Sequence, residues 1–194
     1  LDPGHGGHDT GSISPAGLTE KDLVLDIAKR LGALIAERLG SQVIYTRTDD
    51  SFVPLEARTE LANQQKADLF VSLHANSSRL RWIAGAETYY LNFTTSASAL
   101  EVAARENATS EKSIHELQEL VQKITLKTKS QESREFAAAV QRALYNNLWK
   151  GKTPVKDRGV KKAPFVVLIG ASMPSVLVEI DFLSNARSGK LLQS

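Results

Sequence analysis

Residues 68–74 read Asp-Leu-Phe-Val-Ser-Leu-His, a short apolar run that ends in a histidine. Its length and its content of Val, Leu and Phe favour a buried strand over a helix. Residues 175–180 (Ser-Val-Leu-Val-Glu-Ile) repeat this character near the other end of the chain. Helical patterns separate the two runs, and strands that alternate with helices are typical of an α/β domain with a mainly parallel sheet.

The remaining segments complete one domain. The glycine-rich stretch 1–19 is predicted to be the end of a strand followed by a loop. We expect helices at 20–39, 54–65 and 132–149, further strands at 42–47, 86–92 and 164–169, and a last helix after Ser184-Asn185. The polar stretch 97–131 is predicted to form one or two helices with an apolar stripe of Leu117, Leu120, Val121 and Ile124. The sequence thus predicts an α/β fold over 1–194, with a mixed, mainly parallel twisted sheet, helices on both faces and a helical insertion at 97–131.

The segment 20–39 carries the clearest helical signal. Thr19 is a suitable N-cap, and Gly40 is a suitable C-terminal stop. The apolar residues recur at helical spacing: Leu23, Val24, Ile27, Leu31, Leu34 and Ile35.

Composition narrows the class of protein. The chain has 194 residues, of which 42% are hydrophobic and 24% charged, as in a globular domain. Its net charge of +2 gives no argument for nucleic-acid binding, which needs a basic stripe. With no cysteine, a metal site must use His, Asp or Glu, which fits a catalytic site better than a structural one. No apolar run reaches the roughly 18 residues of a membrane span. The start at Leu1 predicts an excised domain that has lost its targeting segment and part of its first strand.

Four polar side chains lie where predicted elements meet. His5 follows the first strand, His74 ends the strand at 68–74, and Glu179 lies near the end of another strand. Glu20 opens the first long helix. Because sites in α/β sheets gather at the carboxyl ends of strands, we expect all four at one sheet edge. A His-Glu-His set with an open fourth position is a known catalytic zinc arrangement, so His5, Glu20 and His74 are the predicted ligands.

Glu179 is the strongest single anomaly, because a carboxylate inside an apolar strand is costly to bury unless it is paired or protonated. Burial raises the pKa of a carboxyl group, which suits one that takes a proton from water and passes it to a leaving amine. Alternation places Asp181 on the same face, where its charge is expected to raise the Glu179 pKa further. A salt bridge between Glu179 and an Arg or Lys remains the alternative.

Each of these signals also has an ordinary structural explanation. A single histidine at a strand end more often makes a structural hydrogen bond, and an acidic residue such as Glu20 commonly interacts with the helix dipole. We interpret His8 and His115 as non-ligands, and Arg47 and Arg58 as residues that brace the fold. The joint placement of the four polar side chains favours the metal site.

Several motifs follow one another along the whole chain. They are Asp-Pro-Gly-His-Gly-Gly at 2–7, Glu-Lys-Asp at 20–22, Thr-Arg-Thr-Asp at 46–49, Phe-Val-Ser-Leu-His-Ala-Asn at 70–76, Asp-Arg-Gly-Val-Lys at 157–161, Pro-Ser-Val-Leu-Val-Glu at 174–179 and Phe-Leu-Ser-Asn at 182–185. In this order they resemble zinc-dependent N-acetylmuramoyl-L-alanine amidases of the cell-division type. The resemblance is weakest at about 94–131. Asp181 departs from the family pattern, which more often has a small or apolar residue there.

The resemblance implies a hydrolase of bacterial peptidoglycan. It would cut the amide between the lactyl group of N-acetylmuramic acid and the L-alanine of the stem peptide. By position, His5, Glu20 and His74 would hold Zn²⁺, and Glu179 would be the catalytic acid/base. The resemblance also implies a role in separating daughter cells, in the periplasm or at the cell wall. We expect a monomer without a transmembrane segment or a nucleic-acid partner.

The stretch 97–131 corresponds to a regulatory insertion in the amidases that it resembles. In division-type members a helical insertion covers the active site until a protein activator displaces it. We therefore expect Glu111, Glu116 or Glu119 to occupy the metal's open position. The alternative is a solvated helical hairpin.

Two other functions stay open on the residues alone. A zinc carboxypeptidase of the same fold needs an arginine near the metal for the substrate's carboxylate, and Arg158 is the candidate. A peptidoglycan-binding module without activity should have lost Glu179 or a ligand, and all four residues are present.

Overall fold

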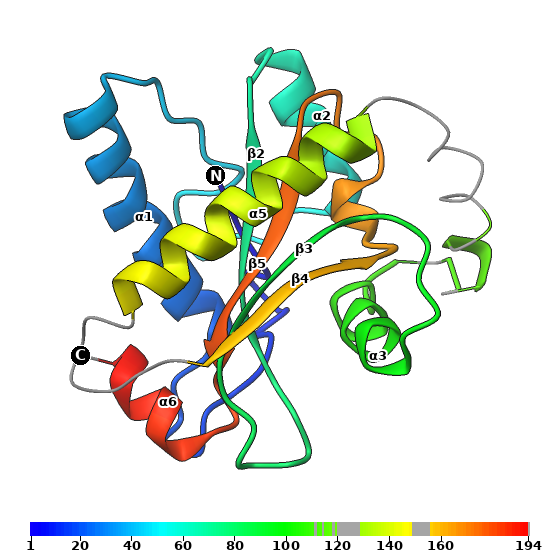
Figure 1. The fold of residues 1–194 in the computed structure, drawn as a ribbon. Helices are drawn as coiled ribbons and strands as arrows, with labels where there is room; N and C mark the ends of the chain where they lie inside the picture. Colours follow the sequence, from blue (N-terminus) through cyan, green and yellow to red (C-terminus); the bar gives the residue numbers. More distant parts are fainter. Residues whose placement is uncertain (111, 114, 118, 120–128, 149–155, 194) are drawn as a thin grey trace.

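The computed structural model describes all residues except 111, 114, 118, 120–128, 149–155 and 194. Within the described residues, five strands form a twisted sheet with helices against both faces (Figure 1). In order across the sheet the strands are β1 (Asp2–Pro3), β2 (Phe70–Asn76), β5 (Ser175–Phe182), β3 (Ala86–Leu91) and β4 (Asp157–Ala163). β1, β2 and β5 are parallel, and β3 pairs antiparallel with β5 and parallel with β4. The predicted mixed, mainly parallel α/β fold is confirmed.

The helices agree with the sequence prediction within a few residues at their ends. They are α1 (Glu20–Leu39), α2 (Leu55–Gln64), α3 (Ala97–Glu106), α5 (Lys129–Leu148) and α6 (Ala186–Leu192), with a short 3₁₀ helix η1 (Val166–Leu168). α1 ends as predicted at Gly40, which adopts the left-handed conformation at φ 63° and donates its N–H to the Ala36 carbonyl. α6 begins after Asn185, whose side chain accepts from the backbone N–H groups of Arg187 and Ser188.

The two faces of the sheet follow from alternation along the central strand β5. Val176 and Val178 face the layer made by α1 and α5, where Val24 and Ala137 pack. Leu177 faces the other layer, together with α2, α3 and η1. Glu179 follows Leu177 by two residues, so β5 carries a carboxyl group on the face covered by α3.

The predicted strand at 42–47 is not formed. Its backbone runs beside the start of the chain, where the Leu1 amino group donates to the Ile44 carbonyl at 2.6 Å and the Thr46 N–H donates to the Leu1 carbonyl at 3.1 Å. These two bonds do not extend into a ladder within the described residues. Val43 and Ile44 therefore show strand character in the sequence without making a strand.

The predicted strand at 164–169 is also wrong. Its buried apolar residues form η1, and the preceding residues form the edge strand β4, which the sequence reasoning did not assign. Lys161 and Lys162 hide the strand pattern of β4, and charged residues of this kind are common on edge strands. A short apolar run fits a buried turn as well as a strand.

The polar stretch 97–131 begins with α3, and α5 begins at Lys129. Leu117 is buried, as its place in the predicted apolar stripe requires. Leu120, Val121 and Ile124 lie outside the described residues. Among the helices of the described chain, none combines the length and apolar character needed to cross a membrane.

Candidate metal centre

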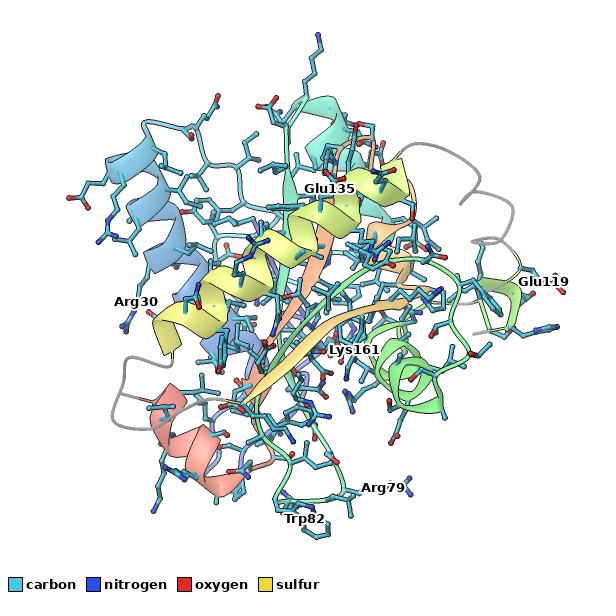
Figure 2. All side chains as sticks on the ribbon, viewed as in Figure 1. Arg30, Arg79, Trp82, Glu119, Glu135 and Lys161 are labelled. Carbon is cyan, nitrogen blue, oxygen red and sulfur yellow. The ribbon has the colours of Figure 1, made fainter. Side chains whose placement is uncertain are left out.

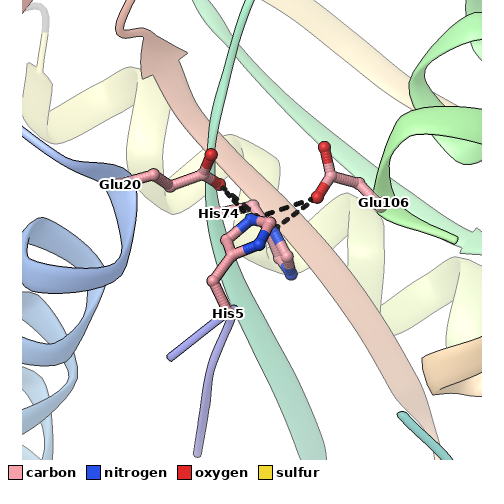
Figure 3. A group of neighbouring side chains, drawn as sticks. All are labelled: His5, Glu20, His74 and Glu106. Carbon is pink, nitrogen blue, oxygen red and sulfur yellow. Dashed lines mark hydrogen bonds and ion pairs between the residues drawn. The ribbon is translucent and has the colours of Figure 1, made fainter. Parts of the chain in front are cut away.

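Four ionisable side chains from distant parts of the chain meet near the carboxyl end of β2 (Figure 3). His5 lies in the loop after β1, Glu20 is the first residue of α1, His74 lies in β2 and Glu106 is the last residue of α3. Each offers one nitrogen or oxygen atom, and these atoms all lie within 4.8 Å of one another. The fold thus brings together the three residues predicted from the sequence and adds Glu106, which the sequence reasoning missed.

Four of the distances between the candidate ligand atoms are close to those expected around a zinc ion. His5 Nε2 lies 3.0 Å from Glu20 Oε1 and 3.3 Å from Glu106 Oε2. His74 Nδ1 lies 3.2 Å from Glu20 Oε1 and 3.0 Å from Glu106 Oε2. Zinc bonds of about 2.0–2.1 Å in a tetrahedron place neighbouring ligand atoms roughly 3.3 Å apart. Imidazole nitrogens and carboxylate oxygens are also donors that zinc accepts.

Two of these atoms, His5 Nε2 and Glu106 Oε2, are buried and have no hydrogen-bond partner among the described residues. Buried polar atoms are costly when nothing satisfies them. A cation between the four side chains would satisfy both atoms. The residues present therefore fit a divalent metal.

Neighbouring groups fix the orientation of the candidate ligands. His5 Nδ1 lies 2.9 Å from Asp9 Oδ2, which turns Nε2 toward the site, as partners of metal-binding histidines commonly do. The backbone N–H groups of Ser12 and Ala75 donate to the two carboxylate oxygens of Glu20, at 2.8 and 2.9 Å. Glu20 therefore approaches the histidines in one fixed position.

Two buried arginines hold the loop that carries His5: Arg58 does so with the predicted salt bridge, whereas Arg47 donates to backbone carbonyl groups. Arg58 donates to the His5 carbonyl at 2.9 Å and pairs with Asp2 at 2.9 Å. Arg47 donates to the Gly4 carbonyl at 2.8 Å and to the Pro3 carbonyl at 3.0 Å. These bonds support His5 in its left-handed conformation at φ 60°, which is uncommon for a residue other than glycine.

Two glycines allow the close packing of the site. A Cβ atom at Gly4 would lie 2.3 Å from the ring of His74, and one at Gly11 would lie 2.6 Å from the ring of His5. Either contact is far closer than van der Waals distance. The glycine-rich loop predicted from the sequence therefore leaves room for both imidazoles.

The imidazolium and carboxylate charges within the cluster stabilise one another. Burial lowers the pKa of His5, but the carboxylate of Glu20 and other neighbours outweigh burial and raise it to about 12. Burial also lowers the pKa of His74, and the Glu106 carboxylate outweighs it and raises the value to about 10. Burial raises the pKa of Glu20, yet the charge of His5 dominates and lowers it to about 2. Because metals bind neutral imidazole, a metal must displace these protons.

Glu179 lies beside the cluster and is fully buried. It is the register partner of His74 on one side and of Glu87 on the other. Neither of its carboxyl oxygens has a hydrogen-bond partner among the described residues, so the salt bridge considered from the sequence is not formed there. Burial, followed by the charge of Glu106, raises the pKa of Glu179 well above its usual range. The carboxyl group therefore favours its protonated form.

Asp181 has a different task from the one expected. Its Oδ1 accepts the backbone N–H groups of Gly85 and Phe182, both at 2.7 Å. The negative charges that chiefly raise the Glu179 pKa are those of Glu106 and Glu20. Asp181 thus holds the loop before β3 against the end of β5.

The identity of the fourth residue of the cluster, a second carboxylate, corrects the sequence prediction for 97–131. Glu116 bonds to Ser113 and is exposed, Glu119 lies at the periphery of the molecule (Figure 2), and Glu111 lies outside the described residues. The residue from this stretch that joins the cluster is Glu106. A signal for it was present, because Ala99, Val102, Ala103 and Glu106 recur at i, i+3, i+4 and i+7, which places a glutamate on the buried stripe of α3.

The other histidines and Arg158 lie outside the cluster. The His8 ring lies tilted against the Phe52 ring, with the two centroids 4.2 Å apart, and His115 lies 3.4 Å from Glu119 at the surface. Arg158 donates to Glu87 Oε2 at 2.8 Å. Within the described chain, the group of residues spaced to hold a metal is the one built by His5, Glu20, His74 and Glu106.

A buried group of residues that could hold a metal, with a protonated carboxyl beside it, suits the hydrolysis of an unreactive bond. The chain matches the N-acetylmuramoyl-L-alanine amidase family over residues 1–194. It therefore belongs to this family of enzymes, in agreement with the resemblance read from its motifs.

Individual relatives give the same result. The chain is 36% identical to the N-acetylmuramoyl-L-alanine amidase AmiC of Escherichia coli O6:H1, and the match covers all of this chain and 47% of AmiC. It spans about half the length of the curated relatives that it matches first.

Solved amidases share the fold. An N-acetylmuramoyl-L-alanine amidase from Clostridium difficile 630 superposes with a TM-score of 0.74 at 30% identity, covering all of this chain and 83% of that one. The CwlD amidase of Clostridioides difficile, solved in complex with the GerS lipoprotein, superposes with a TM-score of 0.71 at 27% identity, covering all of this chain and 86% of CwlD.

Proposed function

We propose that this domain hydrolyses the amide bond between N-acetylmuramic acid and the L-alanine of the peptidoglycan stem peptide. Its cofactor is Zn²⁺, held by His5, Glu20 and His74. The observation that carries the proposal is the buried cluster beside Glu179, in a chain that belongs to an amidase family along its whole length. A zinc ion in such a site supplies a Lewis acid that polarises a carbonyl and makes water more acidic.

Glu179 is the proposed acid/base of this reaction. Its carboxyl group faces the same side of the sheet as His74 and has no hydrogen-bond partner of its own among the described residues, so it is free to exchange a proton with a reacting group. In its carboxylate form it takes a proton from the attacking water, and in the resulting protonated form it delivers that proton to the leaving nitrogen of the L-alanine. A raised pKa suits both steps, because the group must hold and release a proton near neutral pH.

Glu106 is proposed to keep the domain in a closed state. Its Oε2 lies 3.3 Å from His5 Nε2 and 3.0 Å from His74 Nδ1, where it would take the fourth position at the metal. That position must be open for a substrate. The stretch 97–131 is therefore a regulatory insertion, and its displacement by an activator protein would expose the site.

The cellular role follows from the same family resemblance. We propose a peptidoglycan amidase of the periplasm or cell wall that helps separate daughter cells. The relative solved with the GerS lipoprotein supports the idea that amidases of this fold bind protein partners.

The chemistry is tested on one preparation by elemental analysis for zinc and by mass spectrometry of fragments released from purified peptidoglycan. We expect one zinc per chain and new free amino groups on L-alanine. Cleavage within the stem peptide would instead favour a carboxypeptidase or peptidase. A zinc-free chain that takes up no zinc would overturn the proposed site.

Regulation is tested with Glu106→Ala and its matched control Glu116→Ala, since Glu116 lies in the same stretch but bonds only locally to Ser113 in the described structure. Glu106→Ala should raise the basal rate of stem-peptide release, and Glu116→Ala should leave it unchanged. A folded, zinc-loaded Glu106→Ala chain with the unaltered basal rate would refute the closed state.

A further inference from the structure

Arg105, the residue before Glu106, fastens the end of α3 to the end of β2. Its guanidinium donates to Asn76 Oδ1 at 2.6 Å and to the Ser77 carbonyl at 2.8 Å, and its Nε lies 3.2 Å from Glu106 Oε1. Asn76 is the last residue of β2 and Ser77 follows it, so the two acceptors lie two and three residues beyond His74. The proposed reaction assigns no role to these two acceptors.

Asn76 is fixed in its orientation by buried partners behind it. Its Nδ2 donates to Glu87 Oε1 at 2.9 Å, and Glu87 in turn is held by Lys161 at 2.6 Å and Arg158 at 2.8 Å. Figure 2 shows Lys161 on the edge strand β4. With its nitrogen engaged by Glu87, the side-chain oxygen of Asn76 must point toward α3.

The Asn76 oxygen has room for one more donor besides its local bond. A carbonyl oxygen has two lone pairs. The backbone N–H of Ser77 takes one, at 2.7 Å, and Arg105 takes the other. If α3 withdraws, Asn76 Oδ1 and the Ser77 carbonyl both lose a charged donor at the same moment.

These acceptors lie at the same sheet edge as the candidate catalytic groups. Asn76 follows His74 by two residues in β2, and its side chain bonds to Glu87, which like His74 is a register partner of Glu179. Asn76 is only 1% exposed, whereas the Arg105 side chain is 32% exposed. Arg105 therefore lies between the acceptors and solvent.

We propose that Asn76 Oδ1 and the Ser77 carbonyl form an acceptor pair for peptide N–H groups of the substrate's stem, and that Arg105 fills this pair in the closed state. The stem peptide begins at the bond that is cut and is rich in N–H donors, so its first residues must pass close to the metal ligands. The end of α3 then occupies two positions of the substrate. Arg105 supplies N–H donors to the acceptor pair, and Glu106 places a carboxylate oxygen at the metal site. This inference rests on the proposed function.

Substitutions at the two ends of the hydrogen bond between Arg105 and Asn76 should change the KM in opposite directions. Arg105→Ala removes the competitor and leaves the acceptors, so the KM for a soluble muropeptide should fall about tenfold, the value of a hydrogen bond to a charged group. Asn76→Ala removes an acceptor, so the KM should rise about fivefold, the value of a neutral hydrogen bond. A simple latch without substrate contact predicts that both substitutions lower the KM.

Binding without turnover gives an independent readout. In a Glu179→Gln background, titration calorimetry with N-acetylmuramoyl-L-alanyl-D-isoglutamine should show the same opposite shifts in Kd. Arg30→Ala is the control, because Arg30 is 72% exposed on α1 and pairs only with Asp26 among the described residues. Zinc content and melting temperature show whether each variant is folded, and Arg105→Ala keeps the test valid if Asn76→Ala does not fold.

The outcomes distinguish a failure of the acceptor pair from a failure of the closed state. Lower KM and Kd in both Arg105→Ala and Asn76→Ala would overturn the acceptor pair but leave the closed state intact. A Kd that neither substitution changes would also overturn the pair. Failure of Glu106→Ala to raise activity, with opposite shifts still present in the Kd measurements, would overturn the closed state and leave the acceptor pair standing.

Discussion

Glu87 and Glu179 lie directly opposite each other on the antiparallel strands β3 and β5, and their carboxyl groups have opposite preferences for a proton. Burial raises the pKa of both groups. At Glu87 the bond from Lys161 and other donors outweigh burial, so the pKa is lowered. At Glu179 burial is reinforced by the charge of Glu106, and the pKa is raised well above its usual range. Environments that separate two carboxyl groups in this way distinguish a structural anion from a proton carrier.

The first prediction concerns turnover. Glu179→Gln keeps the shape of the side chain but cannot carry the proton, so stem-peptide release should fall by about 10²–10⁴-fold. Zinc content should not change, because Glu179 is not among the four residues spaced to hold the metal. Glu135→Gln on the exposed side of α5 (Figure 2) serves as the control. Unaltered turnover in the Glu179 variant would remove this residue from the mechanism.

The same substitution should stabilise the metal-free chain, and the gain should depend on pH. Because the folded pKa of Glu179 is raised, the unfolded chain loses its proton above about pH 4.3 while the folded chain keeps it. The penalty for burying Glu179 is therefore absent below that pH and grows as the pH rises. In thermal unfolding with a chelator, Glu179→Gln should melt at a higher temperature near pH 7 and at nearly the same temperature near pH 4. An equal gain at both values would contradict this origin.

Metal affinity should rise with pH. Zinc must displace protons from His5 and His74, whose pKa values are raised to about 12 and about 10, so acid strengthens the competition from protons. Titration calorimetry in buffers of different ionisation enthalpy should detect proton release on zinc binding. His74→Ala should abolish stoichiometric binding, whereas His115→Ala, at the exposed surface, should not. Full zinc retention by His74→Ala would mean that the ligand set is wrong.

Gly4→Ala should disrupt the site through steric contact alone. The new Cβ atom would lie 2.3 Å from the His74 ring, so the imidazole must move away from the cluster. We expect at least a tenfold loss of zinc affinity with the fold retained, since second-layer changes at metal sites typically cost about 10–100-fold. Gly189→Ala is the matched control, because its Cβ atom would approach no atom closer than 3.4 Å. Equal zinc affinity in the two variants would show that the loop adapts.

The sequence predicts those parts of the site that local pattern determines. His5 and His74 stand out because His5 comes just after one predicted strand and His74 ends another, and the parallel sheet brings such strand ends together. Glu106 was missed because its segment has a polar composition, and only the buried stripe of α3 reveals it. The choice between Glu106 and the later glutamates depends on where a helix docks, which no local pattern specifies.

The incorrect predictions about the fold have a similar cause. Residues 42–47 have strand propensity but bond to the start of the chain without forming a ladder, and 164–169 are apolar because they are buried as a turn. The lysines of β4 are compatible with an edge position, which the sequence alone does not specify. Asp181 was expected to act on Glu179, yet backbone N–H groups engage it. In each case the residue pattern was recognised correctly, but contacts with residues distant in the sequence determined the structure or the role that resulted.

β5 is the last strand in the chain but the central strand of the sheet, between β2 and β3. Until residues 175–182 insert there, β2 and β3 have no common neighbour, and Glu179 has no place beside His74. Synthesis that stops before residue 175 therefore yields a chain in which the site cannot assemble. For the proposed peptidoglycan amidase, such incomplete copies would lack both the central strand and the proposed acid/base Glu179.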